Sequence, residues 1–325
     1  MTKRLAVLAT GGTIAGIAGS AIAQDYRAGE LGIDEYLDRV GGLGLEAELY
    51  GRQIANIDSA NIGMEMWRAL HTELQATLGD PDCHGAIVTH GTDTLEETAF
   101  LLDLTLPSSK PVVVVGAMRP ADAVGYDGLR NFANAVRVAG DSDAAGRGVL
   151  VVMGDRVFGA RDVRKVRTRG ADAFRGFPRE SVGLVTPSSL EWFGAAWRDG
   201  AAARFDWPDA LPEVVILHAY AGFDGACVER QVGRTTGGIV VAGVGEGNMS
   251  DSARSALTLL AADGIPVIRA SRVDEGLVDR EGEDEANGFV AARALNPAKA
   301  RILLQVLLAN GVRDAAAIQR EFDRR

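Results

Sequence analysis

The chain has 325 residues, of which 47% are hydrophobic and 24% are charged, as is ordinary for a globular protein. Its 34 Lys and Arg residues against 44 Asp and Glu residues give a net charge of −10. This balance argues against nucleic acid or an anionic membrane as a partner. Only two cysteines occur, Cys83 and Cys227, so neither a disulfide framework nor a CxxC metal site is expected.

The residues near the start of the chain bear on the cellular location of the protein. Lys3 and Arg4 precede the apolar run 5–9, which is too short for the core of a signal peptide and is typical of a first core strand. No stretch of about 18 uncharged apolar residues occurs, so no membrane span is expected. We therefore expect a cytoplasmic protein, and the lack of a nearby partner for Cys83 agrees with a reducing compartment.

Short apolar runs rich in β-branched residues recur along the chain and predict strands. They lie at residues 5–10, 85–89, 111–116, 148–153, 213–219, 237–242 and 265–270. The run Val112–Val115 is apolar on both faces, which is typical of a parallel sheet covered by helices. Between the strands, apolar spacings of three and four predict helices at 62–78, 94–106, 128–139, 251–263 and 297–309. Strands alternating with helices predict a doubly wound α/β fold.

Residues that favour helix N-termini mark the expected starts of three helices. Ser59 or Asn61 is placed to cap the helix over 62–78, and Pro297 suits the first turn of the last helix. The sequence 94–97, TLEE, has the pattern of a capping box.

Segment 186–212 differs in composition from its surroundings. It contains three tryptophans, three prolines and a run of alanines. We interpret residues 188–212 as a linker between a larger N-terminal domain of residues 1–187 and a smaller C-terminal domain of residues 213–325. The tryptophans indicate that this segment packs against other parts of the chain.

The first chemical motif is the turn GGTIAG at residues 11–16, directly after the first strand. A dinucleotide fingerprint needs glycine where this chain has Thr13, and no GxxxxGK[ST] sequence is present. Glycines often serve only to form a tight turn. Alone, this motif leaves open whether Thr13 has a chemical role.

The second motif, HGTDT at residues 90–94, follows the strand over 85–89. Thr92 and Asp93 are both common helix N-caps, but capping does not account for so many hydroxyls at one strand end. Open α/β sheets bind ligands at the carboxyl ends of their strands. Two threonines, Thr13 and Thr92, facing one crevice therefore suggest nucleophilic attack on a carbonyl group.

A threonine hydroxyl needs a base or a cationic neighbour to react near neutral pH. Candidate helpers are Tyr26, Lys165 and a carboxylate late in the chain. Lys165 ends the basic run 161–165; such runs usually face solvent, but a lysine buried beside other cations can accept a proton. The four histidines are scattered without HExxH, GxSxG or metal-ligand spacing, and His90 is expected to be structural and hydrogen-bonded.

Six segments of the chain match, in order, the signatures of one family. The two main ones are LATGGTIA at residues 8–15 and VTHGTDTLEET at residues 88–98. The supporting segments are residues 115–120, 161–165, 243–248 and 288–297. On these matches the sequence resembles the bacterial-type L-asparaginases of the asparaginase/glutaminase family over nearly its whole length.

The resemblance implies a fold, an activity and an assembly. The fold is α/β, with a larger N-terminal flavodoxin-like parallel-sheet domain and a smaller C-terminal α/β domain. The activity is that of an amidohydrolase that converts L-asparagine to L-aspartate and ammonia through a threonine acyl-enzyme, without a cofactor. The assembly is a homotetramer built from dimers that share active sites.

The resemblance also implies catalytic roles. Thr13 would be the nucleophile, with Tyr26 as its hydroxyl partner. Thr92, Asp93 and Lys165 would form a second set of hydroxyl, carboxylate and amine. Either set can supply the nucleophile in principle, and we favour Thr13, with Lys165 assisting Thr92.

Substrate binding follows in the same way from the resemblance. Ser59 would hold the α-carboxylate, Asp93 the α-ammonium, and the carbonyl oxygen of Ala117 the amide NH2. A zwitterionic substrate also needs hydrogen-bond donors, which the backbone amides after Gly91 can supply to its carboxylate or to an oxyanion.

Further positions extend or depart from the family pattern. Asn248 and a late glutamate would reach the site from a neighbouring subunit; counting back seven residues from Gly288 selects Glu281, with Glu283 as the alternative. Ala60 stands where relatives commonly present Gln or Glu to the substrate amine. This exchange is expected to weaken recognition of the amine or to shift the preference between asparagine and glutamine.

Three rival functions stay open at this point. A broad-specificity glutaminase-asparaginase has the same motifs. A subunit of a tRNA amidotransferase is a second rival, although such subunits usually carry an N-terminal extension. A non-enzymatic α/β ligand-binding module would keep the pocket without needing Thr13.

Overall fold

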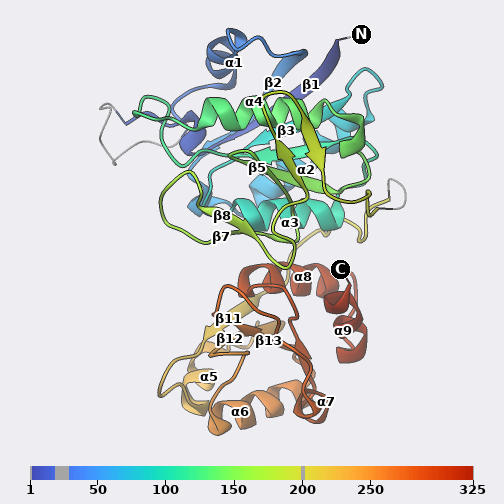
Figure 1. Ribbon diagram of the computed structural model, residues 1–325. Helices are drawn as coiled ribbons and strands as arrows, with labels where there is room; N and C mark the ends of the chain where they lie inside the picture. Colours follow the sequence, from blue (N-terminus) through green and yellow to red (C-terminus); the bar gives the residue numbers. More distant parts are fainter. Residues whose placement is uncertain (1, 19–28, 199–201, 325) are drawn as a thin grey trace. The chain divides into compact units, whose positions relative to one another are not determined.

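The computed structural model describes residues 2–18, 29–198 and 202–324 (Figure 1). The chain forms two compact units, Met1–Arg204 and Phe205–Arg325. Within the segment predicted as a linker, Leu190–Trp192 forms a strand of the first unit, and Trp192 and Trp197 pack against that unit's core. The proposed domain boundaries themselves stay a prediction.

The first unit is built on a mixed sheet with the strand order β10-β9-β6-β5-β4-β3-β1-β2 among the described residues. Its strands are β1 (Lys3–Gly11), β2 (Ala47–Ile57), β3 (Gly85–Thr89), β4 (Val112–Val115), β5 (Val149–Met153), β6 (Arg156–Gly159), β9 (Gly183–Val185) and β10 (Leu190–Trp192). Strands β2-β1-β3-β4-β5 are parallel, and β6, β9 and β10 extend the sheet antiparallel. The parallel order 2-1-3-4-5 is that of flavodoxin-like sheets, so the predicted fold class is confirmed.

Helices cover both faces of this sheet. They are α1 (Ile33–Gly41), α2 (Met64–Gly79), α3 (Leu95–Thr105) and α4 (Gly128–Ala139), with short 3-10 turns η1 (Thr13–Ala15), η2 (Ser59–Asn61) and η3 (Ser142–Ala144). Helices α1 and α4 lie on one face, and α2 and α3 on the other (Figure 1). Tyr36 of α1 meets Phe132 of α4 edge to face, with ring centroids 5.2 Å apart. All of β4 is buried, because both of its faces are covered, as the sequence predicts.

The predicted side-chain caps of α2 and α3 are wrong, whereas Pro297 begins the helix Pro297–Ala309, as predicted. Helix α2 begins after Gly63 without a side-chain cap, and Ser59 and Asn61 belong to η2 instead. Thr94 is the N-cap residue of α3, but its side chain makes no capping bond. Its hydroxyl donates instead to the carbonyl oxygen of Ser59, at 2.8 Å. A long-range contact has therefore replaced the local one that the sequence suggests.

A small hairpin brings one more segment to the first unit. Strands β7 (Val163–Lys165) and β8 (Phe174–Gly176) form a separate antiparallel pair. The backbone amide of Lys165 donates to Glu96 on α3, at 3.0 Å. This bond fixes the end of β7 beside the helix that follows β3.

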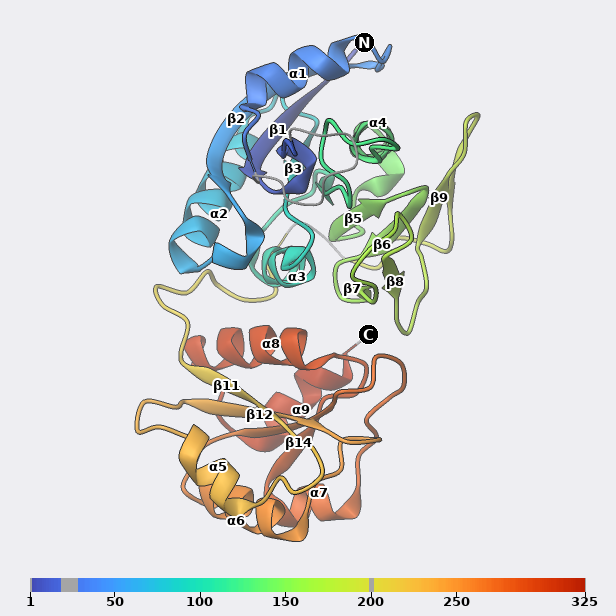
Figure 2. The same ribbon diagram turned by 90° about the vertical axis from the view of Figure 1, so that its left-hand side faces the viewer.

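The second unit has a four-stranded parallel sheet in the order β11-β12-β13-β14. Its elements are β11 (Val214–His218), β12 (Gly238–Gly243), β13 (Val267–Ser271), β14 (Phe289–Ala291), α5 (Gly225–Gln231), α6 (Asp251–Ala262), α7 (Gly282–Asn287), α8 (Pro297–Ala309) and α9 (Ala315–Asp323). Helices α5 and α6 pack on one face of the sheet and α8 on the other (Figure 2). Across the described parts of the chain, no helix is long and apolar enough to cross a bilayer.

Candidate active site

Two backbone turns meet at the carboxyl ends of β1 and β3. After β1, Gly12 adopts φ +80°, and Thr13 then opens η1. A Cβ on Gly12 would lie less than 3.0 Å from the Cα and N of Gly91, so only glycine allows this approach. The hydroxyl of Thr10 also donates to the carbonyl oxygen of Thr89, at 2.9 Å. The strand ends carrying Thr13 and Thr92 are thereby held side by side.

Both threonines lie in protected positions. Thr13 and Thr92 are both buried, and each residue is 6% exposed. Strands β1 and β3 are neighbours in the sheet, while the chain continues from β1 to β2 on one side and from β3 to β4 on the other. This is the topological switch point at which open α/β sheets bind ligands.

Lys165 connects the Thr92 hydroxyl to a carboxylate. Its Nζ donates to Thr92 Oγ1 at 3.0 Å and forms a short ion pair with Asp93. The lysine side chain is 18% exposed, whereas that of Asp93 is 59% exposed. The amine thus lies on the inner side of the cluster, and the carboxylate faces outward, where a ligand can reach it.

Ser59 lies directly against the second motif. It is buried, and its Oγ accepts the backbone N–H of Asp93 at 3.2 Å. A Cβ on Gly91 would lie 2.7 Å from that oxygen, so glycine is again required. Among the described residues, no acceptor is shown for the hydroxyl hydrogen of Ser59. Ala60, the next residue, is exposed and donates its N–H to Asp58 at 2.9 Å.

The turn after β4 closes the site on a third side. Ala117 is fully buried, and a Cβ on the preceding Gly116 would lie 3.0 Å from Thr92 Cγ2. The side chain of Asn131 donates to the carbonyl oxygen of Gly116 at 3.0 Å. The carboxylate of Asp127 accepts the backbone N–H of Met118, at 3.1 and 3.0 Å to its two oxygens. These bonds fix the peptide planes on either side of Ala117.

Sequence reasoning did not identify this supporting layer. Besides Asp127 and Asn131 it includes Tyr126, whose hydroxyl donates to the carbonyl oxygen of Ile14 at 2.6 Å and so holds the turn next to Thr13. The available signal was weak: Asp127 immediately precedes the helix predicted over 128–139, where a polar cap is expected.

His90 has a structural position, as predicted. It is fully buried, with Nδ1 2.6 Å from the carbonyl oxygen of Gly91 and Nε2 2.9 Å from Thr98 Oγ1. Burial lowers the pKa of His90 to about 4 from its usual 6.5, so the ring is neutral at physiological pH. Both ring nitrogens are engaged within the fold, and His90 therefore supports the turn without facing a ligand.

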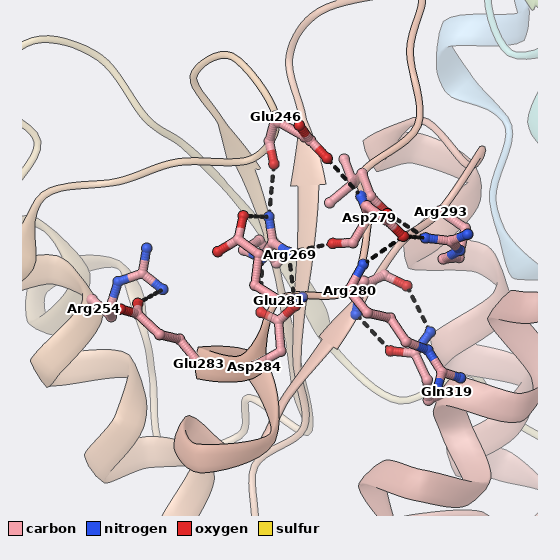
Figure 3. Close-up of polar contacts among 12 residues, drawn as sticks. Glu246, Arg254, Arg269, Asp279, Arg280, Glu281, Glu283, Asp284, Arg293 and Gln319 are labelled. Carbon is pink, nitrogen blue, oxygen red and sulfur yellow. Dashed lines mark hydrogen bonds and ion pairs between the residues drawn. The ribbon is translucent and has the colours of Figure 1, made fainter.

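Three predicted site residues remain, Tyr26, Asn248 and Glu281. Tyr26 falls outside the described residues. Asn248 and Glu281 belong to the second unit, where Asn248 is exposed after β12 and Glu281 immediately precedes α7. Glu281 lies 3.2 Å from the buried guanidinium of Arg269, whereas Glu283 is 70% exposed and pairs with Arg254 at 3.4 Å (Figure 3). Within the described ranges, no three His, Cys, Asp or Glu side chains are placed to hold a metal ion.

Comparison with family models covers both units. The model described as "Asparaginase, N-terminal" matches residues 4–198, and "Glutaminase/Asparaginase C-terminal domain" matches residues 213–322. The chain belongs to the asparaginase family. The family resemblance drawn from its six sequence segments is thereby confirmed.

Individual members of the asparaginase family match over nearly their whole length. A probable periplasmic L-asparaginase of Haemophilus influenzae is 40% identical over 98% of this chain and 92% of its own. A glutaminase-asparaginase of Pseudomonas fluorescens is 38% identical over 97% and 89%. The crystal structure of a probable cytoplasmic L-asparaginase from Campylobacter jejuni superposes with a TM-score of 0.91 at 37% identity, covering 98% of this chain and 99% of that one.

Proposed function

We propose that this protein is an amidohydrolase that converts L-asparagine to L-aspartate and ammonia through an acyl-enzyme on Thr13. The observation that carries the proposal is the contact of Lys165 with Thr92 and Asp93 at the point where the Thr13 turn packs on Gly91. An amine, a carboxylate and two hydroxyls there match what acyl transfer requires: a nucleophile, a proton carrier and a charged anchor for the substrate.

The proposed reaction has two steps, acylation and deacylation of Thr13. In the first, Thr13 Oγ attacks the side-chain carbonyl carbon, its proton passes to the amide nitrogen, the C–N bond breaks and ammonia leaves. In the second, water attacks the aspartyl ester, the C–O bond to Thr13 breaks, and the hydroxyl regains its proton. Lys165 and Thr92 carry the protons, and Tyr26 is proposed as the hydroxyl partner of Thr13. No cofactor takes part in either step.

Substrate recognition follows from charge. The hydroxyl of Ser59 donates to the substrate α-carboxylate, and the exposed carboxylate of Asp93 attracts the α-ammonium. Backbone amides after Gly91 add donors, each contributing about 3–4 kcal/mol if it meets a developing oxyanion. The Ala117 carbonyl oxygen, held in place by its neighbours' hydrogen bonds, accepts the amide NH2.

Asn248 and Glu281 complete the site from a neighbouring subunit in the proposed homotetramer. Both belong to the second unit, and Glu281 carries a charge suited to the α-ammonium. We favour Glu281 over Glu283 because its carboxylate is anchored beside the Asn248 loop, through Arg269. Mixing the inactive Thr13→Ala protein with the Glu281→Gln protein, whose KM is raised, should create sites with the wild-type KM under subunit exchange; no recovery, or an active monomer in ultracentrifugation, would contradict shared sites.

A broad-specificity glutaminase-asparaginase is the second candidate. It is favoured by Ala60, which offers no polar group to the substrate amine, and by the Pseudomonas fluorescens relative of that name. A coupled ammonia assay with L-asparagine, D-asparagine and L-glutamine separates the two. L-asparagine should react fastest; comparable rates with L-glutamine would favour the second candidate, and tight binding without ammonia release would favour a ligand-binding module.

The proposed location is the cytoplasm. Cys83 and Cys227 are free and buried, which suits a reducing compartment. The names of the relatives point both ways, because the Haemophilus influenzae protein is called periplasmic and the Campylobacter jejuni protein cytoplasmic. Cell fractionation with the native gene product decides between the two compartments.

A further inference from the structure

One buried arginine connects the two segments of the second unit that are proposed to contact substrate. Arg269 lies in the middle of β13 and is fully buried. Its Nε and one terminal nitrogen donate to the two oxygens of Asp284, at 2.8 and 2.7 Å. Figure 3 shows the guanidinium between Asp284, Glu246 and Glu281. A fork of this kind fixes the plane of the guanidinium, which a lysine ammonium does not do.

The same guanidinium holds the loop that ends in Asn248. It donates to the carbonyl oxygen of Glu246 at 2.7 Å. Gly247, at φ +89°, lies so close to the arginine stem that a Cβ there would be 3.0 Å from Arg269 Cγ. Two hydrogen bonds of 2.7 and 2.8 Å join the backbone of Asn248 to that of Val244. The position of Asn248 is therefore set by a loop that rests directly on Arg269.

Glu281 contacts the arginine directly and is also bonded to the arginine's partner, Asp284. Its carboxylate lies 3.2 Å from the guanidinium, and its backbone N–H donates to Asp284 at 2.9 Å. The carboxylate of Asp284 is 6% exposed and neutralises the arginine charge inside the fold. The carboxylate of Glu281 is 37% exposed, so its negative charge is the one that faces outward.

We infer that Arg269 is a positioning residue that presents Asn248 and Glu281 as one preformed surface for the substrate α-ammonium. This inference rests on the proposed function. A buried arginine–aspartate pair by itself only indicates a structural ion pair. Here the same guanidinium also contacts both the Asn248 loop and Glu281. Loss of its two parallel hydrogen bonds to Asp284 therefore leaves both segments without their shared support.

The test exchanges Arg269 for lysine, which keeps the charge but not the fork. Two inhibitors report on the ammonium: the product L-aspartate carries one, and its analogue succinate does not. In Arg269→Lys, the KM for L-asparagine and the inhibition constant of L-aspartate should rise about 10- to 100-fold, while the constant for succinate changes less than about twofold. Equal shifts for both inhibitors, or a lowered Tm with unchanged affinities, would overturn the inference.

The matched control is Arg254→Lys, the same exchange at a second largely buried arginine, which pairs with α7 through Glu283. It should alter neither inhibition constant. If Arg269→Lys does not fold, Asp284→Asn weakens the same fork while keeping side-chain size, and the same preferential loss of L-aspartate binding is expected.

A crystal structure of the folded variant separates this inference from the proposed function. If the wild-type protein neither binds nor hydrolyses L-asparagine, the proposed function fails. The positioning role is then decided by the coordinates alone. Displacement of Glu281 and of the 246–248 loop in the variant supports it, and unchanged positions contradict it.

Discussion

Gly12 and Gly91 are in direct backbone contact, and this contact brings the Thr13 and Thr92 turns together. A methyl group on Gly12 has no room, because it would lie less than 3.0 Å from the Gly91 backbone. The φ of +80° at Gly12 adds a second reason for glycine. The site therefore depends on a pair of residues that have no side chains.

Gly12→Ala should disrupt both stability and activity. Gly44 is a matched control, since it also has a positive φ, +65°, but open space where a Cβ would go. Gly44→Ala is expected to cost about 1–2 kcal/mol from backbone strain alone, and Gly12→Ala about 1–3 kcal/mol more from overpacking. Turnover should fall about 100-fold only in Gly12→Ala, because the two turns separate. Urea unfolding and ammonia release measure the two effects; equal losses in both variants would contradict the steric account.

Lys165→Met should lower kcat without unfolding the protein. The lysine is the only group among the described residues that is shown bonding to both Thr92 Oγ1 and Asp93 Oδ1, so its loss removes the proposed proton carrier. Loss of general acid–base assistance should lower kcat about 10²- to 10⁴-fold. Single-turnover ammonia release is the measurement. Arg167→Met, at an exposed arginine two residues on, is the control and should retain wild-type kcat.

Glu281→Gln and Glu283→Gln should behave differently. Glu281 is anchored to a buried cation, while Glu283 lies largely in solvent. The first substitution should raise the KM for L-asparagine about 10- to 100-fold, through a lost charged hydrogen bond. The second should change it less than about twofold. The reverse pattern in steady-state kinetics would assign the role to Glu283.

His90 should make the protein less stable in acid. Its folded pKa, about 4, lies below its usual 6.5, so the unfolded chain binds the proton more tightly. The contribution of the neutral ring to the free energy of unfolding is complete above pH 6.5. It is lost as the pH falls toward 4, and the loss is roughly 3 kcal/mol at most. Urea unfolding across this window should show a shallower decline in His90→Asn than in wild type. Parallel curves for the two proteins would contradict the assignment.

The parallel core could be predicted because burial on both faces leaves a continuous apolar signal. The four valines of β4 and the helix over 128–139 were identified from sequence, and the latter coincides with α4 (Gly128–Ala139). Strand β2 and helix α1 were not identified. Strand β2 lies at the sheet edge and mixes Glu48, Arg52 and Gln53 with apolar residues, so its pattern resembles a loop.

The location of the candidate site could be predicted, but not its internal contacts. The carboxyl ends of parallel strands lie at one edge of a sheet, so the Thr13 and Thr92 motifs are expected at the same edge from sequence alone. The bond from the Thr94 hydroxyl to the Ser59 carbonyl spans 35 residues and has no local signal. The same holds for Arg269, whose partners Glu246 and Asp284 lie 23 and 15 residues away. Such contacts depend on tertiary packing.

The most direct test of the account is to trap the acylated residue. L-asparagine is mixed with the enzyme, the reaction is quenched in acid within milliseconds, and peptides are identified by mass spectrometry. The account predicts an aspartyl adduct on the peptide that contains Thr13, absent from Thr13→Ala, whose turnover should fall by about 10⁴-fold or more. An adduct on Thr92 instead, or wild-type turnover in Thr13→Ala, would contradict it.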